Sequence, residues 1–125
     1  MIRAAIENNR GKYAQAIENL QPASRFELGT VSGFWVNYLR AEAYMGQRSA
    51  REAAVEYQKI LDHRAIDFFS PLYPVAHLGL ARAAALTGDT SKSRTEYQNF
   101  FAAWKDADQD LPVLVQAKKE YEQLK

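Results

Sequence analysis

Apolar and polar residues alternate along this chain with the period of an α-helix. In the last fifteen residues, the following apolar side chains would lie on one side of a helix, with charged residues between them: Leu111, Leu114, Val115, Tyr121 and Leu124. Alternating runs of β-branched residues, which would indicate strands, are absent, and strong helix formers dominate. We therefore predict an all-α fold with helices over residues 2–9, 12–21, 33–45, 50–62, 71–86, 90–105 and 111–124.

Several of these predicted helices carry signals at their ends. The tripeptide at 88–90 (GDT) combines a glycine that can end one helix with a polar residue that can cap the next. Ser49 and Glu52 have the spacing of a capping box, and Pro112 suits a first helical turn. The links near residues 11, 48 and 88 are short, so we expect antiparallel helical pairs, whereas longer links at 21–32 and 63–70 separate the pairs.

The chain also repeats itself internally. Residues 56–61 (EYQKIL) match residues 96–101 (EYQNFF) at an offset of 40, which also aligns Ala41 with Ala81 and Ala53 with Ser93. A weaker copy at 11–20 places Ala16 at an offset of 37 from Ala53. A small residue in mid-helix lets paired backbones approach closely, and stacked pairs bury the apolar sides that one pair would expose.

This pattern resembles the tetratricopeptide repeat (TPR), a helix–turn–helix unit of about 34 residues. Residues 80–84 (LARAA) and, more loosely, 40–44 (RAEAY) match the family's Leu-Gly-x-x-Tyr stretch. The pairs Ala53/Tyr57 and Ser93/Tyr97 match its later Ala-x-x-x-Phe, while Asn37 and His77 stand where the family has a leading Trp. The resemblance implies one domain over 1–125, a right-handed α-α superhelix with helical hairpins at about 1–24, 33–63 and 71–105 and a capping helix over 111–124.

A narrower resemblance concerns residues 56–64, 76–83, 86–90 and 104–108. These segments are similar to TPR tails of bacterial, acidobacterial-type regulators, where they follow serine/threonine kinase or winged-helix DNA-binding domains. The resemblance implies that this chain is the C-terminal sensor or docking part of a longer signalling protein. Any kinase or regulator activity would then lie outside these residues. Met1 opens directly into helical sequence, as we expect of such a part.

Composition narrows the function. A chain of 125 residues with 47% hydrophobic residues can bury a core without disulfides. The absence of cysteine excludes disulfides, Cys-ligated metals and thiol catalysis, and it fits a cytoplasmic location. A net charge of +1, with Arg and Lys dispersed, argues against a nucleic-acid partner. No apolar run approaches the ~20 residues that span a bilayer, so we expect no membrane segment.

No catalytic, cofactor or metal site can be assembled from the sequence. We expect His63 at a helix end and His77 in an interface, and no glycine-rich phosphate motif is present. The acidic run at 106–110 resembles the opening of a calcium loop, but Leu111 and Ala117 stand where that loop requires Gly and Glu. We interpret the run as a helix cap. The prediction is a chain that is not an enzyme and needs no cofactor.

The candidate site is the inner face that the first helices of the stacked pairs would form. An i, i+4, i+7 stripe on the predicted helix at 33–45, continued into the neighbouring pairs, predicts this lining: Asn8, Trp35, Tyr38, Glu42, Met45, Leu78 and Arg82. Its mixture of apolar and charged side chains suits a peptide or protein segment. The alternative is that Trp35, Tyr38 and Leu78 pack between helices.

A second candidate patch lies in the longest insertion and comprises Phe68, Phe69 and Tyr73. Exposed, it would bind a partner; we favour the alternative that it tucks between pairs. The sequence as a whole predicts a non-catalytic protein–protein interaction module. The alternative function is self-association, in which the chain would make its parent protein a homo-oligomer.

Overall fold

The computed structural model describes residues 2–22, 33–63 and 70–124, and within these ranges every regular element is a helix. The helices are α1 (Ile2–Asn9), α2 (Tyr13–Leu20), α3 (Gly33–Gly46), α4 (Ala50–Asp62), α5 (Leu72–Thr87), α6 (Thr90–Ala103) and α7 (Pro112–Glu122). The predicted all-α class is confirmed, and each predicted helix is present with ends that differ by no more than two residues. None of these helices is both long enough and apolar enough to cross a bilayer.

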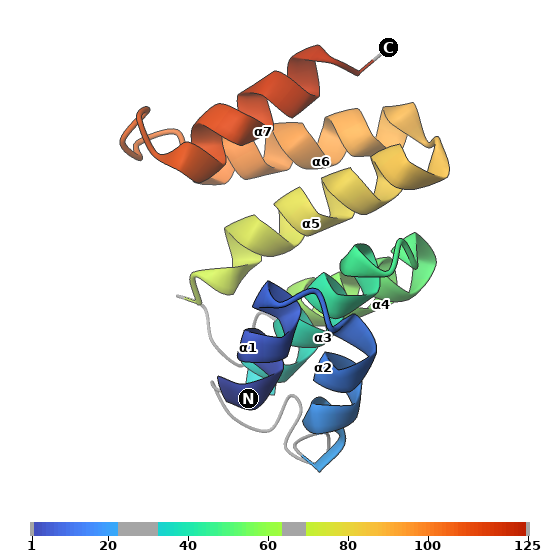
Figure 1. Cartoon of the computed structure of the whole chain (residues 1–125). Coiled ribbons are helices and arrows are strands. Elements are labelled where there is room, and N and C mark those ends of the chain that lie inside the picture. The colour runs from blue at the N-terminus through green and yellow to red at the C-terminus, as the bar shows by residue number, and fades with distance from the viewer. Residues whose placement is uncertain (1, 23–32, 64–69, 125) are drawn as a thin grey trace.

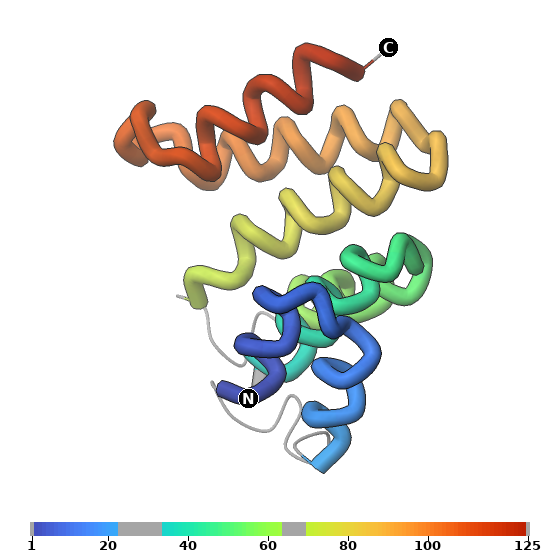
Figure 2. Tube along the Cα trace, viewed as in Figure 1, coloured from blue at the N-terminus to red at the C-terminus, as the bar shows by residue number. Residues whose placement is uncertain are grey.

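Consecutive helices pack in antiparallel pairs, which Figure 1 shows as successive layers. α1 packs on α2, α3 on α4 and α5 on α6, and the pairs meet through the contacts of α2 with α3 and of α4 with α5. α3 also contacts both α1 and α5, while α7 packs on α6. The tube in Figure 2 shows the N-terminal pair at one end of this arrangement and α7 at the other.

The turn between α5 and α6 behaves as its sequence predicts. Gly88 ends α5 in the left-handed conformation, with φ of 85°, where a residue without a Cβ is not strained. The Asp89 side chain then accepts a hydrogen bond from the backbone N–H of Lys92 at 3.1 Å and caps α6. Pro112 lies in the first turn of α7, also as predicted.

The predicted capping box at the start of α4 is wrong. Ser49 is the N-cap residue, but its side chain makes no capping hydrogen bond. Its backbone N–H donates instead to the Tyr44 carbonyl oxygen at 2.8 Å. Because this N–H already closes the turn that follows α3, Glu52 has no donor to reach back to, and the reciprocal arrangement cannot form.

Small residues lie at the crossings inside the pairs. Ala41 and Ala53 are fully buried in the core shared by α3, α4 and α5. At the equivalent crossing, the buried Ser93 hydroxyl on α6 donates to the Ala81 carbonyl oxygen on α5 at 2.8 Å. A serine hydroxyl is short, so this bond requires the two backbones to lie close together. The recurrence of Ala and Ser at an offset of 40 therefore reflects helix packing.

A glycine makes a similar close approach possible between pairs. The ring of Tyr57, on α4, lies against Gly79 on α5, where an added Cβ would overlap the ring. Tyr57 is only 1% exposed, so its ring has little room to move aside. Gly46 and Tyr13 form the same kind of contact between α3 and α2. Aromatic rings thus sit on side-chain-free backbone where one pair meets the next.

Replacing Gly79 by alanine tests this packing. In an exposed helix the change would stabilise the protein by about 1 kcal/mol, because alanine is the better helix former. Here we expect Gly79→Ala to destabilise the protein by about 1–3 kcal/mol through overpacking against Tyr57. Chemical denaturation measures the change, and Ala102→Gly on the exposed side of α6 calibrates the helix-propensity term. A more stable Gly79→Ala protein would contradict the close contact.

Candidate binding site

A cleft of about 440 Å³ opens between the alternate helices α3, α5 and α7. Apolar side chains form much of its wall, and charged groups from three parts of the chain reach it. The complete lining is Met45, Arg48, Arg82, Ala85, Leu86, Tyr97, Glu120, Gln123 and Leu124. The volume lies within the range of sites that hold side chains or small molecules.

One side of the cleft is held by hydrogen bonds that join α5, α6 and α7. Arg82 Nε donates to Glu120 Oε2 at 2.9 Å, and the Tyr97 hydroxyl donates to the same oxygen at 2.8 Å. Gln116 Nε2 donates to the other oxygen, Oε1, at 3.4 Å. Three donors therefore orient one carboxylate.

These contacts also set the protonation of the groups involved. Burial alone would raise the pKa of Glu120, but the hydrogen bonds from Arg82 and Tyr97 outweigh it and lower that pKa. Burial alone would lower the pKa of Arg82, and its bond to Glu120 more than compensates and raises it. Burial and the bond to Glu120 both raise the pKa of Tyr97. The pair is therefore ionised and the phenol neutral at neutral pH.

A second carboxylate lies on α3 near Arg82. Glu42 accepts a hydrogen bond from the Tyr57 hydroxyl, and its charge helps to raise the pKa of Arg82. Burial, followed by the charge of Glu42, raises the pKa of Tyr38 to about 12, against a smaller opposite effect of Arg82. Tyr38 consequently keeps its hydroxyl proton at neutral pH. Charges of alternating sign, Glu42, Arg82 and Glu120, thus link α3, α5 and α7.

The predicted inner-face residues occupy different environments. Met45 and Arg82 line the cleft, and Glu42 lies within electrostatic reach of Arg82. Trp35 is 42% exposed, and its ring meets the edge of Tyr38 with 5.8 Å between the ring centroids. These aromatic residues precede Glu42 on α3, the helix that supplies one wall of the cleft.

Other predicted residues lie away from the cleft. Asn8 Nδ2 donates to the Leu39 carbonyl oxygen at 3.1 Å and ties α1 to α3. Leu78 is 2% exposed and belongs to the core that α5 shares with α6 and α7, so it packs between helices as the alternative reading has it. Tyr73 is buried with its ring at 5.8 Å from that of Phe34. Phe68 and Phe69 lie outside the described residues.

From the sequence we did not predict the cleft residues that come from the C-terminal helix region and from the turn after α3. Glu120, Gln123 and Leu124 lie outside the internal repeat, so the offset of 40 could not locate them. Their spacing does place them on one side of a helix, together with Gln116. That spacing was the available signal, whereas Arg48 lies in a turn and belongs to no helical stripe.

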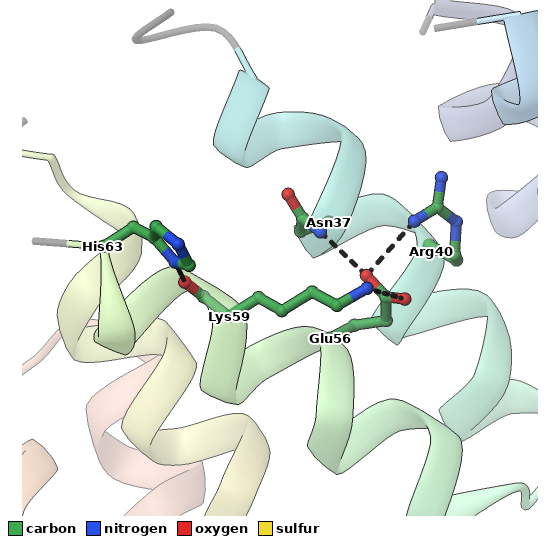
Figure 3. Close-up of polar contacts among 5 residues, drawn as sticks. All are labelled: Asn37, Arg40, Glu56, Lys59 and His63. Carbon is green, nitrogen blue, oxygen red and sulfur yellow. Dashed lines mark hydrogen bonds and ion pairs between the residues drawn. The ribbon is translucent and has the colours of Figure 1, made fainter. Parts of the chain in front are cut away.

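A buried polar cluster, drawn in Figure 3, fastens α3 to α4. Glu56 Oε2 accepts hydrogen bonds from Asn37 Nδ2 at 2.8 Å and from Arg40 Nη1 at 3.2 Å. Lys59 Nζ lies 3.3 Å from the other carboxylate oxygen. Arg40 and Glu56 are each only 6% exposed. None of these residues lines the cleft, so the cluster serves packing.

The next pair repeats this contact with a different partner. His77 Nδ1 lies 2.7 Å from Glu96 Oε2, across α5 and α6. His77 and Glu96 are the residues at an offset of 40 from Asn37 and Glu56. In both pairs, therefore, the same position of the first helix contacts a carboxylate on the second helix. His63 caps α4, with Nδ1 2.8 Å from the Lys59 carbonyl oxygen. Both histidines therefore lie where we expected them, at an interface and a helix end.

The two carboxylates offer a matched test. Glu56→Gln removes a charge that pairs with the buried Arg40 guanidinium at 3.2 Å, so we expect a loss of about 3 kcal/mol in unfolding free energy. Glu96→Gln changes a more exposed contact, because the side chains of His77 and Glu96 are 21% and 15% exposed, and it should cost less than about 1 kcal/mol. Urea denaturation at pH 8 measures both. Equal losses would show that the Arg40–Glu56 pair has no special role.

Within the described residues, no group of three or more Asp, Glu, His or Cys side chains is placed to hold a metal ion. In the acidic run before α7, the Asp108 carboxylate accepts the backbone N–H of Asp110 at 3.0 Å. This local hydrogen bond is typical of a turn. The N-cap residue of α7 is Leu111 and no side chain caps the helix, so the prediction that the acidic run is a helix cap is wrong.

No protein-family model, curated protein or solved structure matches the chain.

Proposed function

We propose that this chain is a non-catalytic interaction module of the TPR type that binds a peptide or protein segment in the cleft between α3, α5 and α7. The observation that carries this proposal is the composition of the cleft. Apolar side chains of Met45, Leu86 and Leu124 lie beside the Arg82–Glu120 pair. A peptide presents apolar side chains next to polar backbone groups, and this lining complements both.

The way the cleft is held favours binding. Arg82, Tyr97 and Glu120 come from three helices and are already hydrogen-bonded to one another. A partner therefore meets oriented groups, and little side-chain freedom is lost when it binds. Met45 can adjust its flexible side chain to partners of different shape.

The cellular role extends the same proposal. The segments that resemble bacterial TPR tails support a sensor or docking part of a cytoplasmic signalling protein. In that arrangement a kinase or DNA-binding domain outside residues 1–125 supplies the activity, and this module chooses the protein that is brought to it.

Filling the cleft should abolish binding without unfolding the protein. Ala85 lies in the cleft on α5 and is exposed, so Ala85→Trp places a large side chain where a peptide would lie. We expect peptides that are selected on the unmodified chain from a random display library to lose at least about tenfold in affinity for the variant. Fluorescence anisotropy measures binding, and circular dichroism checks that helicity is kept.

The matched control is Ala102→Trp on α6, where alanine is also exposed but lies outside the cleft. This variant should bind the selected peptides as the unmodified chain does. Equal binding by the unmodified chain and the Ala85→Trp variant would contradict a binding site in the cleft.

Self-association is a second candidate function, and exposed apolar residues favour it. Ile2 and Ile6 lie one turn apart on α1 and are 82% and 42% exposed. Leu111 and Val115, at the start of α7, are each 38% exposed. Apolar pairs at both ends of the arrangement could cover one another between copies of the chain.

If self-association is the function, the molar mass should rise with concentration, and Ile2→Gln combined with Ile6→Gln should return the chain to a monomer. Multi-angle light scattering on the whole chain measures this. Val55→Gln serves as a control, because Val55 is 56% exposed on α4, away from both ends. A mass that stays monomeric at every concentration would contradict self-association and leave peptide binding as the proposal.

A further inference from the structure

We propose that the cleft selects peptide segments in which an aspartate or glutamate stands next to a large aliphatic residue, and that Arg48 holds the acidic side chain. This inference rests on the proposed binding function and names the chemistry of its ligand. It follows from three observations on the cleft, which concern its acceptors, its donors and the backbone at Arg48.

The two carboxylates in and beside the cleft, Glu120 and Glu42, already accept hydrogen bonds. Glu120 Oε2 accepts from both Arg82 and Tyr97, and Glu120 Oε1 accepts from Gln116. On the neighbouring part of α3, Glu42 Oε1 accepts from the Tyr57 hydroxyl. A ligand that brought an ammonium or guanidinium group would compete with these bonds. The arrangement therefore disfavours a basic ligand.

The donors of the cleft are in surplus. Arg82 uses Nε for Glu120 and also interacts with Tyr97, but its side chain is 35% exposed and can still be reached by a ligand. Arg48 is exposed, and its guanidinium forms no ion pair or hydrogen bond with any residue in the described ranges. A guanidinium binds carboxylates well because two of its N–H groups can point at the two oxygens. Donors in excess over acceptors thus favour a carboxylate on the ligand.

The backbone at Arg48 points to the same conclusion. Arg48 has φ of 62°, in the left-handed region that residues with a Cβ avoid. The repeat offsets of 37 and 40 align Arg48 with Gly11 and Gly88, which have φ of 75° and 85°. Of these three equivalent turns, the middle one therefore places a strained arginine where the others use glycine, and this arginine lines the cleft. Strain kept at a ligand-facing position is typical of a functional residue.

The apolar lining specifies the neighbour of the carboxylate. Met45, Leu86 and Leu124 share the cleft with both arginines, so a ligand that brings a carboxylate to Arg48 also lays the adjacent side chain over apolar surface. Arg48 follows α3 and Arg82 lies on α5, so the two guanidinium groups come from different parts of the cleft. The side chain of an Asp or Glu can extend to one of them while the peptide backbone runs on through the cleft. The ligand group is accordingly an internal Asp or Glu beside Leu, Ile or Met.

The test compares Arg48→Gly with Arg51→Gln on the whole chain. Arg48→Gly copies the two equivalent turns, relieves the left-handed strain and should unfold at the same or a higher temperature. Arg51 is an exposed arginine on α4 outside the cleft, so Arg51→Gln controls for the loss of one positive charge. The probes are the peptides selected on the unmodified chain, each synthesised with a free and with an amidated C-terminus.

We expect the selected peptides to be enriched in Asp or Glu next to Leu, Ile or Met. Arg48→Gly should bind them about tenfold more weakly, as loss of a hydrogen bond to a charged group predicts, while Arg51→Gln and C-terminal amidation change little. Binding to the unmodified chain should also weaken as salt is added.

Three results would overturn the inference. Selected peptides that lack acidic residues, yet lose binding with Ala85→Trp, would leave the binding cleft in place and refute its acidic specificity. Peptides that bind only with a free C-terminus would refute the internal Asp or Glu. If no peptide is selected, or if Ala85→Trp does not affect those that are, the proposed function fails, and the inference fails with it.

Discussion

The close approach of paired helices at small residues is the constraint on which the rest of this structure depends. Ala41 and Ala53 are fully buried where α3 meets α4, and the Ser93 hydroxyl reaches the Ala81 carbonyl oxygen where α5 meets α6. A larger side chain at these crossings would hold the backbones apart. The crossings also fix the rotation of each helix, which is why Met45 on α3 and Arg82 on α5 line the same cleft.

Charged groups serve two purposes in this chain. Glu56 and Arg40 are buried, and their ion pair joins α4 to α3. A buried ion pair can fix the alignment of two helices more specifically than a hydrophobic contact can. Glu120 and Arg82 are partly exposed, and their pairing joins α5 to α7 and shapes the cleft. The buried pair therefore contributes to packing within one helical pair, whereas the partly exposed pair forms part of the wall of the cleft. The degree of burial separates the two purposes.

In the proposed binding function, the turn after α3 would sacrifice stability for binding. Gly11 and Gly88 adopt positive φ without strain, whereas Arg48 adopts it with a side chain. A stabilising glycine is available in the equivalent turns, and its absence here places a guanidinium beside the apolar lining of the cleft. Sites that bind ligands commonly keep such locally unfavourable residues.

The sequence by itself determined the helices and their pairing. Apolar spacing, Pro112 and the Gly88-Asp89 turn act over one or two helical turns, so local chemistry was enough to locate each helix within two residues. The exception, Ser49, arose because its N–H bonds to the turn before it. Only the tertiary structure decided the lining of the cleft. Glu120 meets Arg82 across 38 positions of chain, and whether Leu78 faces a groove or the core depends on how helices rotate against neighbours that are distant in sequence.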